Sequence, residues 1–158
     1  MRSDLTIIFV ILLLFAECGC LSTNSNTSKM SWWKKQPVPY LVEHINDRPY
    51  FDHQDWTFAV DALIEVGRPA LSGGALELLL NEDGLTREHA ENVLYNVVRC
   101  EAGWRLGKGW PPEVDSHEMD REFKELWVKN GDYKWDAPFD TRKASYLKWR
   151  QWLDENPY

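Results

Sequence analysis

The sequence predicts an all-α fold in which a short stack of antiparallel helices forms a single domain. Two stretches repeat apolar residues at i, i+3, i+4, i+7 and i+8, a spacing that places them on one face of an amphipathic helix. Between them, a glycine and a proline stand where helices end and begin. The two apolar faces are Trp56, Ala59, Val60, Leu63 and Ile64, and Ala90, Val93, Leu94, Val97 and Val98.

Gly67 and Pro69 separate the first helix from the next one. Glycine is free to take positive φ, which the residue after a helix often adopts. Proline suits the first turn of a helix, where its missing N–H would have no partner. We therefore expect a new helix after Gly67, and we expect Thr86 to cap the helix that follows it. The apolar positions of the middle helix are Leu71, Ala75, Leu78 and Leu79, and residues 81–84 are its polar stop.

The C-terminal part of the chain predicts two more helices, each preceded by a loop. Glycines and prolines in residues 103–112 indicate the first loop. Asp115 is expected to cap a helix together with Glu118, and Gly131 to end it. Asp140 is expected to cap the last helix after a second, aromatic loop. The apolar faces of these helices are Met119, Phe123, Leu126 and Trp127, and Tyr146, Trp149 and Leu153.

The central segment reads Ala-Leu-Ile-Glu-Val-Gly-Arg-Pro-Ala-Leu from Ala62 to Leu71, and then places Leu78, Leu79, Asp83, Arg87 and Ala90. This pattern resembles a HEAT-type repeat, a family in which two helices meet at a Gly-x-Pro-Ala-like corner. The resemblance implies that Gly67 and Pro69 shape the corner, and that Asp83 and Arg87 tie neighbouring repeats. It covers under a third of the chain, without a second copy at a fixed period, whereas about three repeats are usual for independent stability. A helical bundle that shares the corner is the alternative.

The N-terminus carries an uncharged apolar run, Leu5 to Ala16, which is short for a membrane span and matches a signal-peptide core. Glu-Cys-Gly-Cys20 and a polar tract follow. Together these features resemble a bacterial lipoprotein signal, although Glu17 and Cys18 replace the Leu and small residue that the family prefers. The resemblance implies a signal peptide over residues 1–19 and a lipid on Cys20. Plain secretion and an uncleaved anchor are the alternatives.

Residues 20–40 are predicted to form the lipid-bearing tether, and residues 41–158 the HEAT-like helical domain. Within the tether, Trp32 and Trp33 are expected either to dock on the first helices or to lie at a membrane surface. Residues 41–46 are expected to form a short helix.

The composition argues against several classes of function. The 158-residue chain has a formal net charge of −7, and its basic doublet Lys34-Lys35 is too small to bind a phosphate backbone, so no nucleic-acid partner is expected. The motif Gly107-Lys-Gly109 lacks the surroundings of a phosphate loop, and no cofactor is predicted. The four histidines lack metal-ligand spacing, so they are expected at the surface, and no metal is predicted. Cys100 is expected to be a small buried thiol. No catalytic pair stands out among the carboxylates, and no enzyme is predicted.

Nine tryptophans are the most unusual feature of the composition. The leading prediction is a membrane-tethered extracytoplasmic module that binds an unidentified protein partner through helix faces or aromatic loops. The alternative is a small carbohydrate- or peptidoglycan-binding envelope protein that stacks its ligand on Trp104, Trp110 and Trp135. Solvent-exposed rings would favour binding, and buried rings would favour a structural role.

Overall fold

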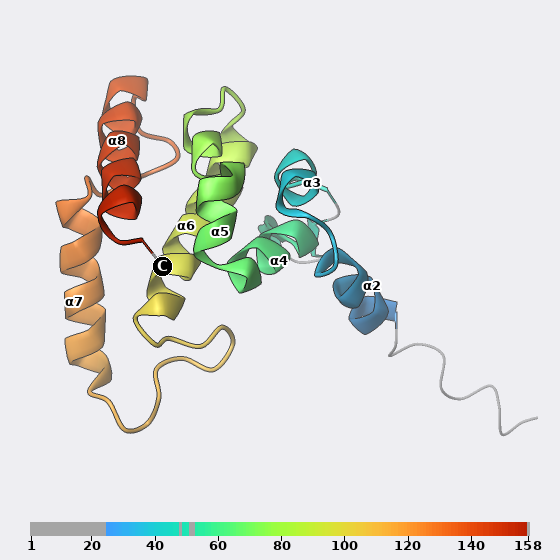
Figure 1. Ribbon diagram of the computed structural model, residues 1–158, viewed down its shortest axis with the longest axis horizontal. Coiled ribbons are helices and arrows are strands. Elements are labelled where there is room, and N and C mark those ends of the chain that lie inside the picture. The colour runs from blue at the N-terminus through green and yellow to red at the C-terminus, as the bar shows by residue number, and fades with distance from the viewer. Residues whose placement is uncertain (1–24, 48, 51–52, 158) are drawn as a thin grey trace, which may run out of the picture.

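Helix α6, from Gly84 to Glu101, lies at the centre of the molecule (Figure 1). The structure is a computed structural model and describes residues 25–47, 49–50 and 53–157. The prediction of a mostly helical single domain is confirmed for these residues. The other elements are α2 (Ser25–Trp33), α3 (Val38–Glu43), β1 (Pro49–Tyr50), β2 (His53–Thr57), α4 (Phe58–Val66), α5 (Arg68–Ala70), the π-helix η1 (Leu71–Ala75), the 3₁₀-helix η2 (Glu77–Leu80), α7 (Ser116–Lys129) and α8 (Phe139–Glu155).

Helix α4 begins two residues after the position that the apolar spacing predicts. Thr57 caps it, since its Oγ1 accepts a hydrogen bond from the Val60 backbone N–H at 3.1 Å. Trp56 therefore lies in strand β2 rather than in the helix, and its Nε1 donates to Asp61 at 2.6 Å. The other four residues of the first apolar face are all buried.

The corner after α4 forms at the predicted residues. Gly67 has φ of 77° and ends α4, and Pro69 lies in the first turn of α5. The expected middle helix is irregular, however: it consists of η1, inside which Gly74 has a non-helical φ of 125°, and of η2. This irregularity turns Leu76 into the core, where it is fully buried, while Leu78 is only half-buried.

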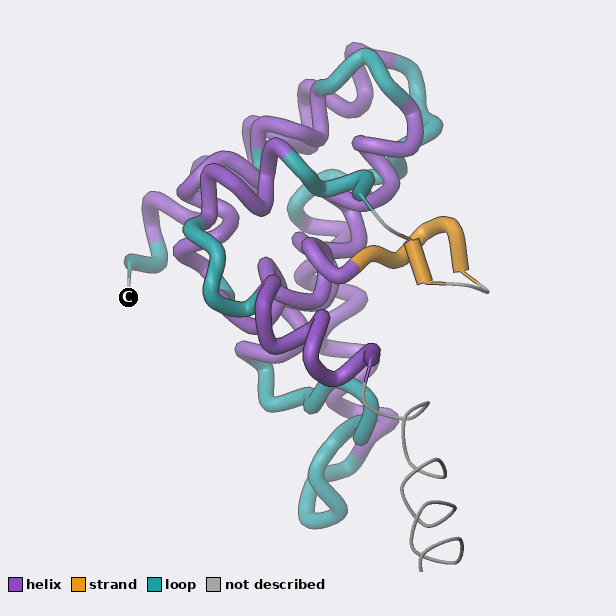
Figure 2. Tube along the Cα trace, turned by 90° about the vertical axis from the view of Figure 1, so that its right-hand side faces the viewer, coloured by secondary structure: helices purple, strands orange, loops and turns teal. Residues whose placement is uncertain are grey.

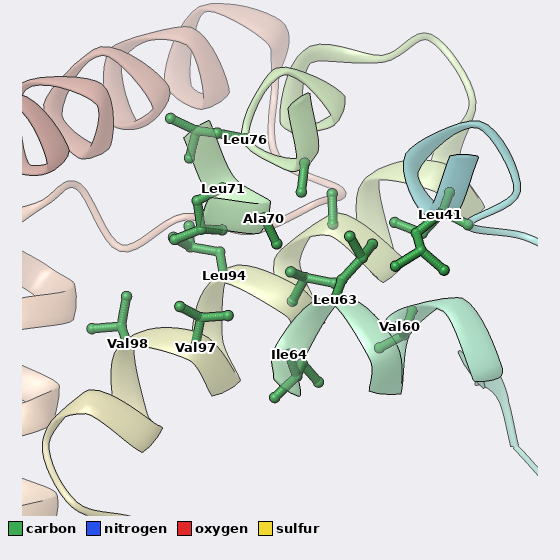
Figure 3. Packing of buried hydrophobic residues seen from close by; sticks show 14 of the residues in the cluster. Leu41, Val60, Leu63, Ile64, Ala70, Leu71, Leu76, Leu94, Val97 and Val98 are labelled. Carbon is green, nitrogen blue, oxygen red and sulfur yellow. The ribbon is translucent and has the colours of Figure 1, made fainter. Parts of the chain in front are cut away.

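Helix α6 buries its whole predicted apolar face against α4, η1 and η2 (Figure 3). Asp83, not Thr86, is its N-cap: the Asp83 carboxylate accepts from the Thr86 backbone N–H at 2.8 Å and from the Thr86 hydroxyl at 2.7 Å. These hydrogen bonds hold the pKa of Asp83 below its usual value. An aspartate at this position also has a favourable interaction with the positive end of the helix dipole.

Helices α7 and α8 extend the core with aromatic rings. Phe123 and Trp127 of α7 pack on Tyr95 of α6 at centroid distances of 4.7 and 5.2 Å, and Trp127 lies 5.1 Å from Trp149 of α8. Asp115 caps α7 as predicted, by accepting from two backbone N–H groups of its first turn. The prediction that Asp140 caps α8 is wrong, because α8 begins at the preceding residue with Pro138 in the cap position.

The N-terminal described residues are helical. Helix α2 lies inside the segment predicted as tether, and α3 begins before the short helix expected at residues 41–46. Trp33 is 2% exposed and belongs to the core, which confirms docking for this ring, whereas Trp32 is 48% exposed. The sequence did not predict the antiparallel pair β1–β2, which projects from the helical body (Figure 2).

Candidate functional site

Arg99, in the last turn of α6, contacts the rings of two of the three tryptophans that were candidates for binding. Its guanidinium carbon lies 4.9 Å from the ring centroid of Trp104 and 5.4 Å from that of Trp110. It also lies 5.8 Å from the rings of Tyr95 and Phe123. A cation over an aromatic face is attracted by the negative charge of the π system, so Arg99 holds these four rings around one centre.

Both tryptophans lie on the loop between α6 and α7, and this loop folds back towards Arg99. The backbone N–H of Trp104 donates to the Arg99 carbonyl at 3.1 Å, which folds the loop back on the helix end. Arg105 and Gly109 then exchange backbone hydrogen bonds at 3.0 and 2.9 Å in a tight turn. Gly109 has φ of 81°, a conformation that glycine adopts at little cost.

Asp120 of α7 also contacts Arg99 and Trp110. Its Oδ1 accepts from Trp110 Nε1 at 2.8 Å and from Arg99 Nη2 at 2.6 Å. These two hydrogen bonds, that of Trp110 first, lower the pKa of the Asp120 carboxyl. Asp120 is therefore a carboxylate at neutral pH and balances the charge of Arg99.

A surface pocket of about 320 Å³ opens beside this centre, between α6 and α7. The rings of Phe123 and Trp127 are mostly buried and form an aromatic wall, while Lys124 is exposed. We call this site the Arg99 pocket; its lining residues are Tyr95, Arg99, Asp120, Phe123, Lys124 and Trp127.

Trp135, the third candidate, lies at a different place. Its backbone N–H donates to Glu91 Oε2 at 2.9 Å, and its carbonyl accepts from Arg87 Nε at 2.8 Å. Both partners are on α6, so they fasten the loop between α7 and α8 to that helix. Burial raises the pKa of Glu91 to about 7, opposed by the Trp135 hydrogen bond and assisted by nearby carboxylates, Asp136 first. Trp104, Trp110 and Trp135 therefore do not form one stacking surface.

Among the histidines whose side chains the structure describes, His89 contradicts the prediction of a surface position. His89 is fully buried in α6, and its Nδ1 lies 2.7 Å from Asn46 Oδ1. In the part of the chain that the structure describes, no three histidine, cysteine or acidic side chains gather as a metal site would require.

Cys100 is half-buried rather than buried, and burial raises the pKa of its thiol. It lines a second pocket, of about 420 Å³, together with Met30 and Lys34 of the N-terminal region and Leu106 of the loop.

Cys20, the predicted lipid-attachment residue, lies outside the described residues. Within the described ranges, no helix is both long enough and apolar enough to cross a bilayer.

Sequence reasoning missed Arg99, Asp120 and Glu91. One signal was present: Tyr95 and Arg99 are four residues apart in a helix, so they share a face. The approach of the loop and of Asp120 is a tertiary contact that spacing does not encode.

Comparisons with protein families, with curated proteins and with solved structures found no match to this chain.

Proposed function

We propose that this protein is a membrane-tethered, extracytoplasmic helical module that binds a protein partner at the Arg99 pocket. The observation that carries the proposal is the composition of that pocket. Tryptophan, tyrosine and arginine are the residues most enriched among those that dominate binding energy at protein interfaces. Here they line one concavity, with Phe123 and Trp127 as its apolar wall.

The electrostatics of the pocket favour a partner that presents both an apolar side chain and a polar or charged group. Arg99 forms an ion pair with Asp120. A side chain of the partner therefore approaches an ion pair without net charge rather than an unpaired guanidinium. Lys124 adds a positive charge at the exposed edge, where it favours an acidic partner residue. The proposal therefore concerns a protein surface with an apolar anchor and an acidic neighbour.

The fold of the module is proposed to be HEAT-like. Support comes from the corner, where Gly67 has positive φ and Pro69 opens the next helix. Arg87 also contributes: it donates to the carbonyl groups of Asn81 and Glu82 before α6, and to that of Trp135 in a later loop. These bonds tie the start of α6 to a following element, as the resemblance implies for this arginine.

The tether is proposed to be a lipid on Cys20 that follows removal of residues 1–19. The test is the intact mass of the protein from the membrane fraction, measured beside a Cys20→Ser variant. A native species that starts at Cys20 and carries acyl mass, absent from the variant, supports the tether. A mature species that starts at Leu21 or later contradicts it.

The binding site is tested by photocrosslinking in the native membrane. A benzophenone amino acid replaces Lys124 at the edge of the pocket, and in a matched control it replaces Lys143, which is exposed on α8. We expect a discrete protein adduct from position 124 and a weaker or absent adduct from position 143. Arg99→Met keeps most of the side-chain bulk but removes the charge, and it should lower the adduct yield.

Two outcomes would contradict the proposed site. Equal adducts from positions 124 and 143 would mean that the pocket has no preference for a partner. Binding of cell-wall fragments that is lost in Trp104→Ala and Trp110→Ala variants would instead favour a glycan ligand for the same loop.

A further inference from the structure

We infer that α2 and the turn after it lie against the bilayer, and that Trp32, Lys29 and Lys35 contact anionic phospholipid headgroups there. This inference rests on the proposed tether and assigns a membrane-contact surface to the described part of the chain. Three independent features of the segment support it: its place in the chain, its charge and the presentation of Trp32.

The place in the chain limits how far α2 can move from the membrane. Helix α2 begins at Ser25, five residues after Cys20. An extended chain spans at most about 3.6 Å per residue, so this connection reaches about 18 Å. A lipid on Cys20 therefore confines the start of α2 to roughly the depth of the headgroup layer and the first water layers above it.

The charge of this segment is opposite to that of the whole chain. Residues 25–36 contain three lysines and no acidic residue, whereas the chain as a whole has a net charge of −7. Lys34 pairs with Glu65 at 2.7 Å. Lys29 and Lys35 are exposed. Lys29 lies three residues before Trp32 on α2, so these two side chains share a side of the helix. Lys35 lies in the turn that follows α2, where its backbone N–H donates to the Trp32 carbonyl at 3.1 Å. A negatively charged membrane attracts such lysines within a Debye length.

Trp32 is presented outward by rings that are themselves held in place. Its ring meets Trp33 edge-on at 5.3 Å and Tyr40 at 5.9 Å, and Trp33 is 2% exposed. Trp32 is 48% exposed in spite of these contacts. The carboxylate of Asp47 lies near these rings, 2.8 Å from His44 Nδ1. Tryptophan and tyrosine favour the membrane–water interface, where one part of the ring system is apolar and another can donate a hydrogen bond.

Fluorescence quenching in reconstituted vesicles tests this surface. The full-length membrane-bound protein is placed in phosphatidylcholine vesicles with or without phosphatidylglycerol. In both kinds of vesicle, the lipid acyl chains carry bromine close to the headgroup. We expect part of the tryptophan emission to be quenched, and this part to disappear in Trp32→Phe but to remain in Trp135→Phe. Replacing Lys29 and Lys35 by Gln should weaken the contact in phosphatidylglycerol vesicles by roughly fivefold per lysine.

The control variant replaces Lys143 and Lys148 by Gln, because both are exposed on α8 and their loss changes the net charge equally. It should leave the quenching unchanged. Quenching that is the same in wild type and Trp32→Phe, in protein that stays with the vesicles, would overturn this inference and leave the tether standing. Protein that leaves the vesicles and lacks acyl mass would overturn both.

Discussion

Replacing Glu91 by Gln should stabilise the protein at high pH and have little effect at low pH. Glu91 is a half-buried carboxyl on α6 that accepts the Trp135 backbone N–H at 2.9 Å. Burial raises its pKa from 4.5 to about 7, so the folded protein holds this proton more tightly than the unfolded chain does. A neutral glutamine keeps an oxygen that can accept the same hydrogen bond, but it never carries the charge that burial disfavours.

The sign follows from proton linkage. Below pH 4.5 the carboxyl is protonated in both states, and the folded state has no penalty. As the pH rises from about 4.5 to about 7, the unfolded chain loses this proton before the folded protein does, so stability falls over this range and levels off above it. The full shift corresponds to about 3 kcal/mol at 1.36 kcal/mol per pKa unit. Part of the side chain reaches solvent, which screens the charge, so we expect about 1–2 kcal/mol.

The assay is urea unfolding, followed by tryptophan emission and far-ultraviolet circular dichroism at several pH values from 4.5 to 8.5. The free energy of unfolding of Glu91→Gln should exceed that of wild type by about 1–2 kcal/mol at pH 8 and should converge with it near pH 4.5. Glu122→Gln is the control, because Glu122 is exposed on α7 and its replacement changes the net charge equally. A difference that does not vary with pH, or a less stable variant at pH 8, would refute the reasoning.

Three further predictions concern the connections of the core, each measured as the free energy of unfolding in urea. Gly131→Ala should cost about 2–4 kcal/mol, because Gly131 has φ of 99° and an added Cβ would lie 2.9 Å from Ser145 Cα; unchanged stability would contradict this. Asp83→Ala should cost about 1 kcal/mol through loss of the α6 cap, whereas Asp83→Asn should retain most of the stability. Tyr133→Phe should cost about 1–2 kcal/mol, since the buried hydroxyl donates to the Leu79 carbonyl at 2.6 Å; a loss no larger than that of an exposed tyrosine would argue against this bond.

Local patterns predicted α4 and α6, but not the broken helix between them. The second apolar face is buried at all five positions, because side chains that recur with helical spacing must share one side of the helix whatever surrounds it. Gly67 and Pro69 also behave as predicted, since their backbone preferences are intrinsic. The predicted helix starts differ from the structure: Thr57, not a residue before Trp56, caps α4, and Asp83 supplies the cap of α6 that was expected from Thr86.

The remaining differences come from tertiary contacts. Gly73 is the clearest example, because an added Cβ there would lie 2.6 Å from Val38 Cγ1 of α3. The irregular helix η1 therefore packs closely against α3 at this glycine, a contact that the local sequence does not reveal. The candidate site shows the same limit. Trp104, Trp110 and Trp135 were all predicted as binding residues, but only the first two meet at Arg99. The backbone of Trp135 is fastened by Glu91 at another place on α6.

The placement of the outer helices has a consequence for the growth of the fold. Solenoids lengthen because each unit leaves an apolar side open for the next one. Here α3 and α4 lie on one side of α5 and α6, and α7 and α8 lie on the other (Figure 1). Arg68 of α5 contacts both α6 and α8: it pairs with Glu101 at the end of α6, stacks on Trp152 of α8 at 4.6 Å and donates to the carbonyl of Asn156. In the described part of the chain, helices therefore flank α5 and α6 on both sides, where a solenoid would leave one side open for the next unit.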